Sequence, residues 1–331
     1  MITIQQIKDY LSEYISDPVP KYILVKEIYK KDPSCSDYIN AYNDMKQSKW
    51  YRELADDQWE NGSWGKFHGG DVEAQKRQKF GCTETALRRA RELSLTKYDP
   101  IIAKCIKIME RYITREEPYP DYVERHQDGG KGFYFGIPFG VAANINIFDP
   151  DNPVIKPFRD VVVKTLKKAF ANGYYNEEVY EQEVRNYRVA TSPGSVFNAM
   201  LLQNSNCMED TLQRQYLNYV WNRKDGIWYV SKFPITEKRS VEDKSFHAWF
   251  AILECLCNFS LFPEFIKDDV LPHLFNEVNR LINEDISLPT PPSGYSVCSH
   301  HVYGRYAESY RDKNNRKTDI VLRIARILVK C

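Results

Sequence analysis

The sequence predicts an all-α protein built as a stack of helical hairpins. Apolar residues recur at helical spacing along most of the 331 residues. No stretch alternates apolar and polar residues convincingly, as a half-buried strand would. An aromatic turn recurs three times, each time ahead of a helical pattern, which is typical of repeat architectures. We therefore expect one domain over 1–331, with a helical cap over 1–57 and repeated turn-plus-hairpin units over 58–331.

The N-terminal cap is expected to hold three helices. Apolar residues fall at helical spacing over 4–15 and 20–31, and the segment Asp17-Pro18-Val19-Pro20 separates the two patterns. Proline interrupts a helix because it lacks an amide donor and fixes φ. A third helical pattern covers 36–54 and ends where the first aromatic turn begins.

The first aromatic turn, over 58–68, contains Asn61-Gly62, where glycine adopts φ > 0 without steric cost. A helical pattern follows from Thr83 to Leu93. Asp99-Pro100 then starts its antiparallel partner, in the order of a capping residue followed by proline. These two segments are expected to form one helical hairpin.

The rest of the chain continues this pattern. A loop rich in glycine and aromatic residues is expected over 128–140. The turn recurs over 224–229 and 293–295, before helical patterns that reach Cys257 and Tyr310. The remaining expected helices cover 152–172, 176–189, 195–204, 209–221, 263–283 and 317–330.

Gln58, Gly62 and Trp64 resemble the QW motif, a Gln followed by Gly-x-Trp, of squalene–hopene cyclases and related prenyltransferase-type proteins. The later copies depart from it, since Asn222 stands at the Gln position and Ser296 at the Trp position. The resemblance implies an (α/α) toroid of the terpenoid-cyclase-like class, and the chain is similar to an uncharacterised bacterial branch of it. In that family the motif ties helices together, so it implies a fold rather than a reaction.

Composition excludes several classes of function. Lys and Arg number 46 against 45 Asp and Glu, so no overall charge favours nucleic acid or an anionic membrane. The eight cysteines form no CxxC pair. No apolar run approaches the ~18 residues of a membrane span, and the N-terminal pattern lacks a signal-peptide core. We expect a cytoplasmic protein with reduced thiols.

A Cys-Ser-His-His segment over 298–301 is the strongest metal-like cluster, because thiolate and imidazole are zinc ligands. Toroid proteins such as protein prenyltransferases and lanthionine cyclases hold zinc through Cys, His and a further residue. The resemblance thus implies zinc, with these candidate ligands: Cys298, His300 and His301, completed by His68, Asp71, Cys82 or His247. The spacing matches no zinc signature, so surface or hydrogen-bonding histidines are the alternative.

Three histidines each follow one of the repeated turns. If the turns share one rim, these side chains would face a common cavity with aromatic and arginine side chains. The candidate catalytic residues are His68, His247, His300 and Asp243, and the candidate ligand-binding residues are Trp64, Arg88, Trp228, Trp249 and Tyr303. Aromatic walls suit a sugar by stacking or a cationic or isoprenoid ligand by cation–π contact. The alternative is that these rings are core residues.

Two further patterns carry charge. Arg88 and Arg91 share a helix face, and their guanidinium groups are suited to phosphate or carboxylate, although Glu84 one turn earlier also explains Arg88 as an ion pair. The sequence Asp-Asp-x-x-Glu over 56–60 matches a magnesium-binding motif. The alternative is that these carboxylates lie in solvent at the end of a helix.

The leading hypothesis is a terpenoid-cyclase-like enzyme or binding protein that holds a small hydrophobic or carbohydrate-like ligand in an aromatic central cavity. The sequence does not determine a reaction. One alternative is a non-catalytic scaffold that binds a protein or peptide on its concave face. Another is an (α/α) carbohydrate-active enzyme, in which Glu84 and Asp243 would be general acid and base.

Overall fold

The structure is a computed structural model. It describes residues 2–68, 79–119, 131–187, 192–227, 233–289, 305–309 and 311–331, with backbone alone at 131–136, 186 and 187. The described residues form helices and no strand, which confirms the all-α prediction. None of these helices is long and apolar enough to cross a membrane.

The first half of the chain begins with α1 and ends with the long helix α8. Its helices are α1 (Ile4–Tyr14), α2 (Pro18–Ile23), the π-helical turn η1 (Leu24–Ile28), α3 (Ser36–Gln47), α4 (Lys49–Asp56), α6 (Thr83–Glu92), α7 (Pro100–Thr114) and α8 (Lys131–Phe148). Seven of these segments are amphipathic or short, whereas α8 is apolar on all sides. A helix of that kind must be buried by its neighbours.

The second half runs from the 3₁₀ turn η2 to the C-terminal helix. Its helices are η2 (Pro153–Ile155), α9 (Lys156–Ala169), α10 (Glu177–Tyr187), α11 (Val196–Leu202), α12 (Asp210–Trp221), α13 (Phe246–Leu256), α14 (Phe262–Ile266), α15 (Val270–Asn283) and α16 (Lys313–Leu328). Helix α13 is buried along nearly its whole length, and α16 presents ten buried residues to its neighbours.

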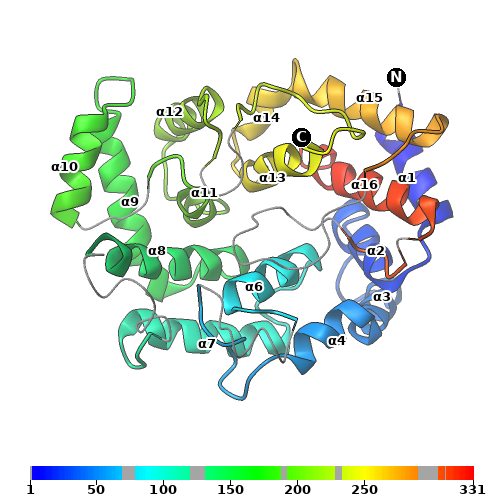
Figure 1. The fold of residues 1–331 in the computed structure, drawn as a ribbon, viewed down its shortest axis with the longest axis horizontal. Helices are drawn as coiled ribbons and strands as arrows, with labels where there is room; N and C mark the ends of the chain where they lie inside the picture. The colour runs from blue at the N-terminus through cyan, green and yellow to red at the C-terminus, as the bar shows by residue number, and fades with distance from the viewer. Residues whose placement is uncertain are drawn as a thin grey trace.

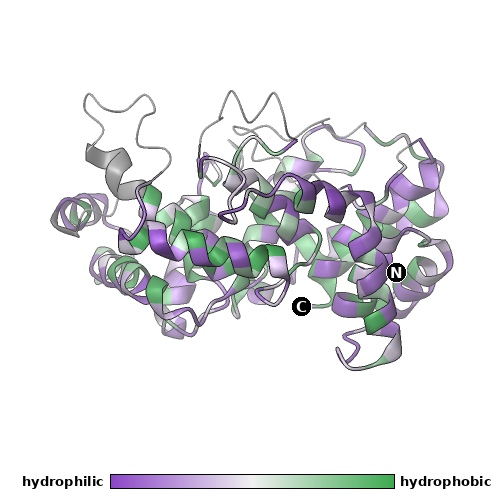
Figure 2. Ribbon diagram, turned by 90° about the horizontal axis from the view of Figure 1, so that it is seen from below, coloured by the Kyte–Doolittle hydropathy of each residue, from purple (hydrophilic) through white to green (hydrophobic). Residues whose placement is uncertain are grey.

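The helices are arranged around the middle of the molecule (Figure 1). Helices α2, α6, α8, α11, α13 and α16 face the middle, and α1, α3, α7, α9, α12 and α15 lie outside them. The two ends of the chain meet, because α16 packs against α1, α15 and η1. Figure 2 shows hydrophobic and hydrophilic residues alternating along the helices, as amphipathic helices require.

The turn after α4 ties this helix to α7. The Gln58 amide donates to the carbonyl oxygens of Gly62, at 2.9 Å, and Ile101, at 2.7 Å. Gly62 has φ of +96°, and a Cβ there would lie 2.6 Å from the Lys104 carbonyl oxygen. The buried Trp64 indole donates to Leu54 of α4 at 2.8 Å. The three residues of the QW-like pattern therefore hold neighbouring helices together.

The loop prediction for 128–140 is wrong from Lys131 onward, because α8 begins there and continues through Pro138. Glycine and proline have low helix propensity, and the sequence prediction relied on this. Packing overrides the propensity here, since α8 lies against α7, α6 and α11. At its C-terminal half Val141, Ala142 and Ala143 are all buried.

Two other predicted helices are each divided in two. The pattern over 36–54 breaks at Ser48, whose hydroxyl accepts from the Tyr51 amide and caps α4. The pattern over 263–283 breaks between α14 and α15. The helix expected up to Tyr310 falls mainly outside the described residues, and its described part, 305–309, is not helical.

Candidate functional site

Two tryptophans that the sequence placed in a ligand cavity lie in the protein core. Trp64 and Trp249 are fully buried. Each indole N–H donates to a backbone carbonyl at 2.8 Å, from Trp64 to Leu54 and from Trp249 to Ile235. These contacts leave both rings packed between helices, and neither ring lines the pocket described below.

Two of the candidate histidines bond charged partners. His68 Nδ1 lies 2.7 Å from Glu84 Oε2. His247 is buried on α13, and its Nδ1 lies 3.0 Å from Nη1 of Arg323. A guanidinium only donates, so His247 Nδ1 accepts and its ring proton lies on Nε2. These two histidines belong to separate ion-pair groups.

Asp243 contacts the start of α13. Its Oδ1 accepts from the hydroxyl and the amide of Ser245, both at 2.7 Å. The hydrogen bond from the Ser245 hydroxyl, together with that from the amide, lowers the pKa of Asp243. Glu84 bonds His68 instead, so the two carboxylates proposed as acid and base have different partners.

Six further candidates lie outside the described residues: Asp71, Trp228, Cys298, His300, His301 and Tyr303. The zinc prediction therefore concerns a segment whose structure is not described. Within the described ranges, no three His, Cys, Asp or Glu side chains are grouped so that they could hold a metal ion.

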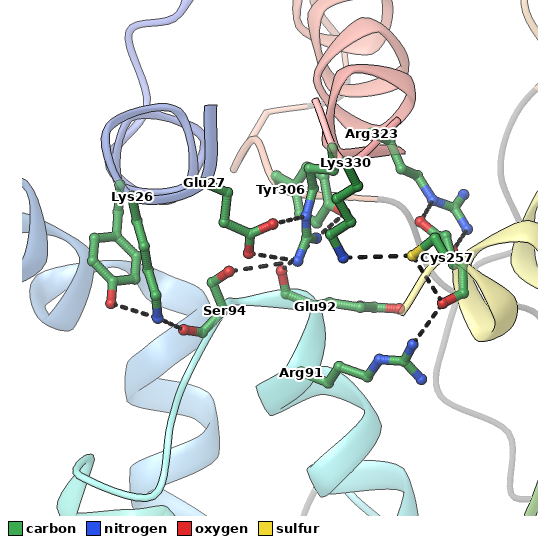
Figure 3. A network of polar contacts seen from close by, with 12 residues as sticks. Lys26, Glu27, Arg91, Glu92, Ser94, Cys257, Tyr306, Arg323 and Lys330 are labelled. Atoms are coloured by element: carbon green, nitrogen blue, oxygen red, sulfur yellow. Dashed lines mark hydrogen bonds and ion pairs between the residues drawn. The ribbon is translucent and has the colours of Figure 1, made fainter. Parts of the chain in front are cut away.

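A pocket of about 430 Å³ lies among η1, α6, α8, α13 and α16, and we call it the central pocket. Six cationic side chains and three carboxylates line it. The cations are Lys26, Lys30, Arg88, Arg91, Arg326 and Lys330, and the carboxylates are Glu27, Glu92 and Glu254. In Figure 3, Lys26 and Glu27 approach from one side, Arg91 from α6, and Lys330 from the end of α16.

The first carboxylate, Glu27, is held by Arg326 of α16. Two bonds of 2.7 and 2.8 Å join the guanidinium to the carboxylate. Arg326 also donates to the Tyr306 hydroxyl at 2.8 Å and to the Glu92 carbonyl oxygen at 3.3 Å. Burial alone would raise the pKa of Glu27, but the charge and bonds of Arg326 hold it below its ordinary value.

The other two carboxylates are held by arginines that do not line the pocket. Arg323 forms a bidentate pair with Glu254, through bonds of 2.7 and 2.6 Å. Arg89 pairs with Glu92 at 2.9 Å, one helical turn earlier on α6. Burial raises the pKa of Glu92, with the Arg89 charge opposing this shift. Arg323 thus compensates the negative charge of Glu254, whereas burial outweighs the effect of Arg89 on Glu92.

Four of the lining cations donate to neutral oxygen atoms. Lys26 donates to the Ser94 carbonyl and the Tyr22 hydroxyl, Lys30 to the Val329 carbonyl, Arg91 to the Glu254 carbonyl and Lys330 to the Asn258 side-chain oxygen. Among the described residues none of the four forms an ion pair with a carboxylate. Burial lowers the pKa of Lys26. The central pocket therefore carries an excess of positive charge.

The rest of the wall combines a few polar residues, among them Asn204 and Asn258, with a group of apolar ones. The apolar residues are Leu95, Ile147, Phe148, Ala251, Ile327 and Val329. Side chains of this kind exclude water and strengthen the attraction between a charged ligand and the lining cations.

Sequence reasoning found part of this pocket. Arg88 and Arg91 were predicted as a local anion site, and both line it. It missed Lys26, Lys30 and Lys330, because these residues meet α6 only after the two ends of the chain come together. No local spacing signals such a meeting. No protein-family model, curated protein or solved structure matches the chain.

Proposed function

We propose that the protein binds a small organic anion in the central pocket, and that the helices around it form an (α/α) toroid of the terpenoid-cyclase-like class. The excess of cationic side chains in the pocket carries this proposal. Taking a charge out of water costs several kcal/mol unless an opposite charge compensates it. A bound anion supplies this charge to the half-buried Lys26, and the exposed Lys330 adds a second cation to the lining.

The lining also favours a class of ligand. Arginine and lysine side chains recognise phosphate and carboxylate, and the lining offers Arg91, Lys26 and Lys30, whose bonds in the structure go to neutral oxygen atoms. Ile147, Phe148 and Ile327 suit an apolar or ring-shaped part of the same ligand. A volume of about 430 Å³ fits one small molecule. The ligand therefore combines an anionic group with a compact organic body.

Thermal unfolding with pyrophosphate and citrate as probes tests the proposal, with sodium chloride at matched ionic strength as the reference. A probe present at about 100 times its Kd stabilises the protein by ~2.7 kcal/mol. For 331 residues this raises Tm by about 4 °C. We expect at least one probe to raise Tm of the wild type in this way.

The variants Lys26→Met and Lys330→Met remove one pocket cation each. We expect both to lose most of the probe-induced rise in Tm, whereas Lys156→Met, which changes an exposed lysine of α9 paired with Asp160, keeps it. The proposal is overturned if neither pyrophosphate nor citrate raises the Tm of the wild type. An equal rise in the wild type and in both pocket variants would also overturn it, because the anion would then bind elsewhere.

A further inference from the structure

A second hollow, of about 990 Å³, lies on the outside of the ring of helices. It is lined by the connection between α9 and α10, one face of α12, and Phe265 of α14. We call it the outer hollow. It shares no lining residue with the central pocket, so it requires its own explanation.

Aromatic rings form one side of the outer hollow. Tyr175 and Tyr219 have ring centroids 4.3 Å apart, and Phe170 packs against them at 5.7 and 6.0 Å. These mutual contacts hold the three rings in place. Next to them, Tyr174 is 65% exposed, on the same connection between α9 and α10. The solvent-exposed ring of Tyr174 therefore lies beside three aromatic rings that are fixed by their mutual contacts.

Polar side chains of α12, the helix that also carries Tyr219, form another part of the lining. Thr211, Gln215, Asn218 and Asn222 recur every three or four residues, so they lie on one face of α12 and just beyond its end. An amide side chain offers both donors and an acceptor oxygen. Asn222 donates to the side-chain oxygen of Asn218 at 3.0 Å, which orients that pair.

The charged side chains of the outer hollow already have ionic partners. Arg214 forms two bonds with Glu264, and Arg223 bonds Asp225 at 2.5 Å. The remaining carboxylate, Asp210, lies one helical turn before Arg214 and interacts with its charge. No uncompensated charge of one sign dominates, so this site favours a neutral ligand, in contrast to the central pocket.

We propose that the outer hollow binds a neutral carbohydrate, with a pyranose ring stacked on Tyr174 and its hydroxyl groups bonded to Gln215 and Asn218. A sugar ring has apolar C–H faces that suit an aromatic ring, and its hydroxyls both donate and accept hydrogen bonds. A proline-rich peptide also binds aromatic grooves, but its prolines lack N–H donors. Its prolines could not donate to the side-chain oxygen of Gln215, whereas a sugar hydroxyl could, so the carbohydrate fits better.

The test is isothermal titration with neutral hexasaccharides of β-1,4-glucose, α-1,4-glucose, β-1,4-xylose and β-1,4-mannose, with decaproline as the competing class. We expect one hexasaccharide to bind the wild type. Tyr174→Ala should weaken its binding about tenfold, and Gln215→Ala should weaken it measurably. Tyr98→Ala is the matched control, because Tyr98 is 83% exposed on a distant connection and should leave binding unchanged.

Three outcomes would overturn the inference. The first is that no hexasaccharide binds. The second is that one binds equally well to the wild type and to Tyr174→Ala, both with unchanged Tm. The third is that decaproline binds and Tyr174→Ala abolishes it, which would assign the outer hollow to a peptide. Lys330 lines the central pocket and not the outer hollow, so Lys330→Met should leave hexasaccharide binding unchanged. The two proposed sites are therefore tested independently of each other.

Discussion

Replacing Gly62 by alanine tests how the turn after α4 holds α7. Gly62 has φ of +96°, which an L-residue adopts only with strain. The new Cβ would also lie 2.6 Å from the carbonyl oxygen of Lys104 and 2.8 Å from its carbonyl carbon. Backbone atoms of a packed helix do not swing aside as a flexible side chain would, so the turn and α7 must separate.

The magnitude follows from two contributions. Strain at positive φ destabilises the fold by ~1–2 kcal/mol. Alanine also lowers the conformational entropy of the unfolded chain, which offsets ~0.4–1 kcal/mol of this loss. Overpacking costs a further ~1–3 kcal/mol. We therefore expect Gly62→Ala to lower the free energy of unfolding by about 1–5 kcal/mol, with a value of about 3 kcal/mol at the middle of each range.

Gly173 provides the matched control. Its φ of +88° is nearly the same, but a Cβ there would meet no atom within 4 Å. Gly173→Ala therefore carries the strain without the collision, and we expect a loss of only ~1 kcal/mol. Urea unfolding followed by far-ultraviolet circular dichroism measures both losses. Equal losses in the two variants would refute the reasoning, because the contact with Lys104 would then contribute nothing.

Two other substitutions test the buried polar contacts. Glu27→Gln and Arg326→Met should each destabilise the protein by ~3–5 kcal/mol, and the double variant by less than their sum, as a double-mutant cycle in urea would show. The pKa of Glu27 is lower in the folded protein than its ordinary value of 4.5, so this pair stabilises the fold above pH 4.5. The stabilisation is lost as the pH falls through the folded pKa of Glu27. The acid unfolding curve of Glu27→Gln should therefore lack this loss of stability. Trp249→Phe leaves the buried Ile235 carbonyl without its indole donor, and should cost ~1–3 kcal/mol in the same assay unless that bond adds nothing.

The helical periodicity of the sequence was enough to predict the fold class, because an amphipathic stripe is a local property of the chain. The prediction failed at α8, where the local signals of glycine and Pro138 point away from a helix. Packing against the neighbouring helices α7, α6 and α11 stabilises α8, whose Val141, Ala142 and Ala143 are buried. A property that depends on packing partners cannot be read from the segment alone.

The candidate site shows the same division. Arg88 and Arg91 were visible as a pair because they are three residues apart on one helix. The lysines that complete the central pocket come from η1 and from the end of α16, and only the meeting of the chain ends places them together. The tryptophans misled the cavity prediction for a related reason. Trp64 and Trp249 fill spaces between helices, and an aromatic residue in a sequence does not tell a core from a cavity.

The formal net charge of +1 is compatible with a cationic pocket because electrostatic selectivity is local. Charges in water interact over a Debye length of about 8–10 Å, so distant surface residues contribute little inside the pocket. Within that range, Glu254 is compensated by Arg323, which stands behind the wall, and Glu92 pairs with Arg89. Four of the cations that line the pocket, Lys26, Lys30, Arg91 and Lys330, donate to neutral oxygen atoms, so a ligand can meet their charge. Nearly equal numbers of acidic and basic residues thus give no overall attraction to a large polyanion, but they are compatible with a site for one small anion.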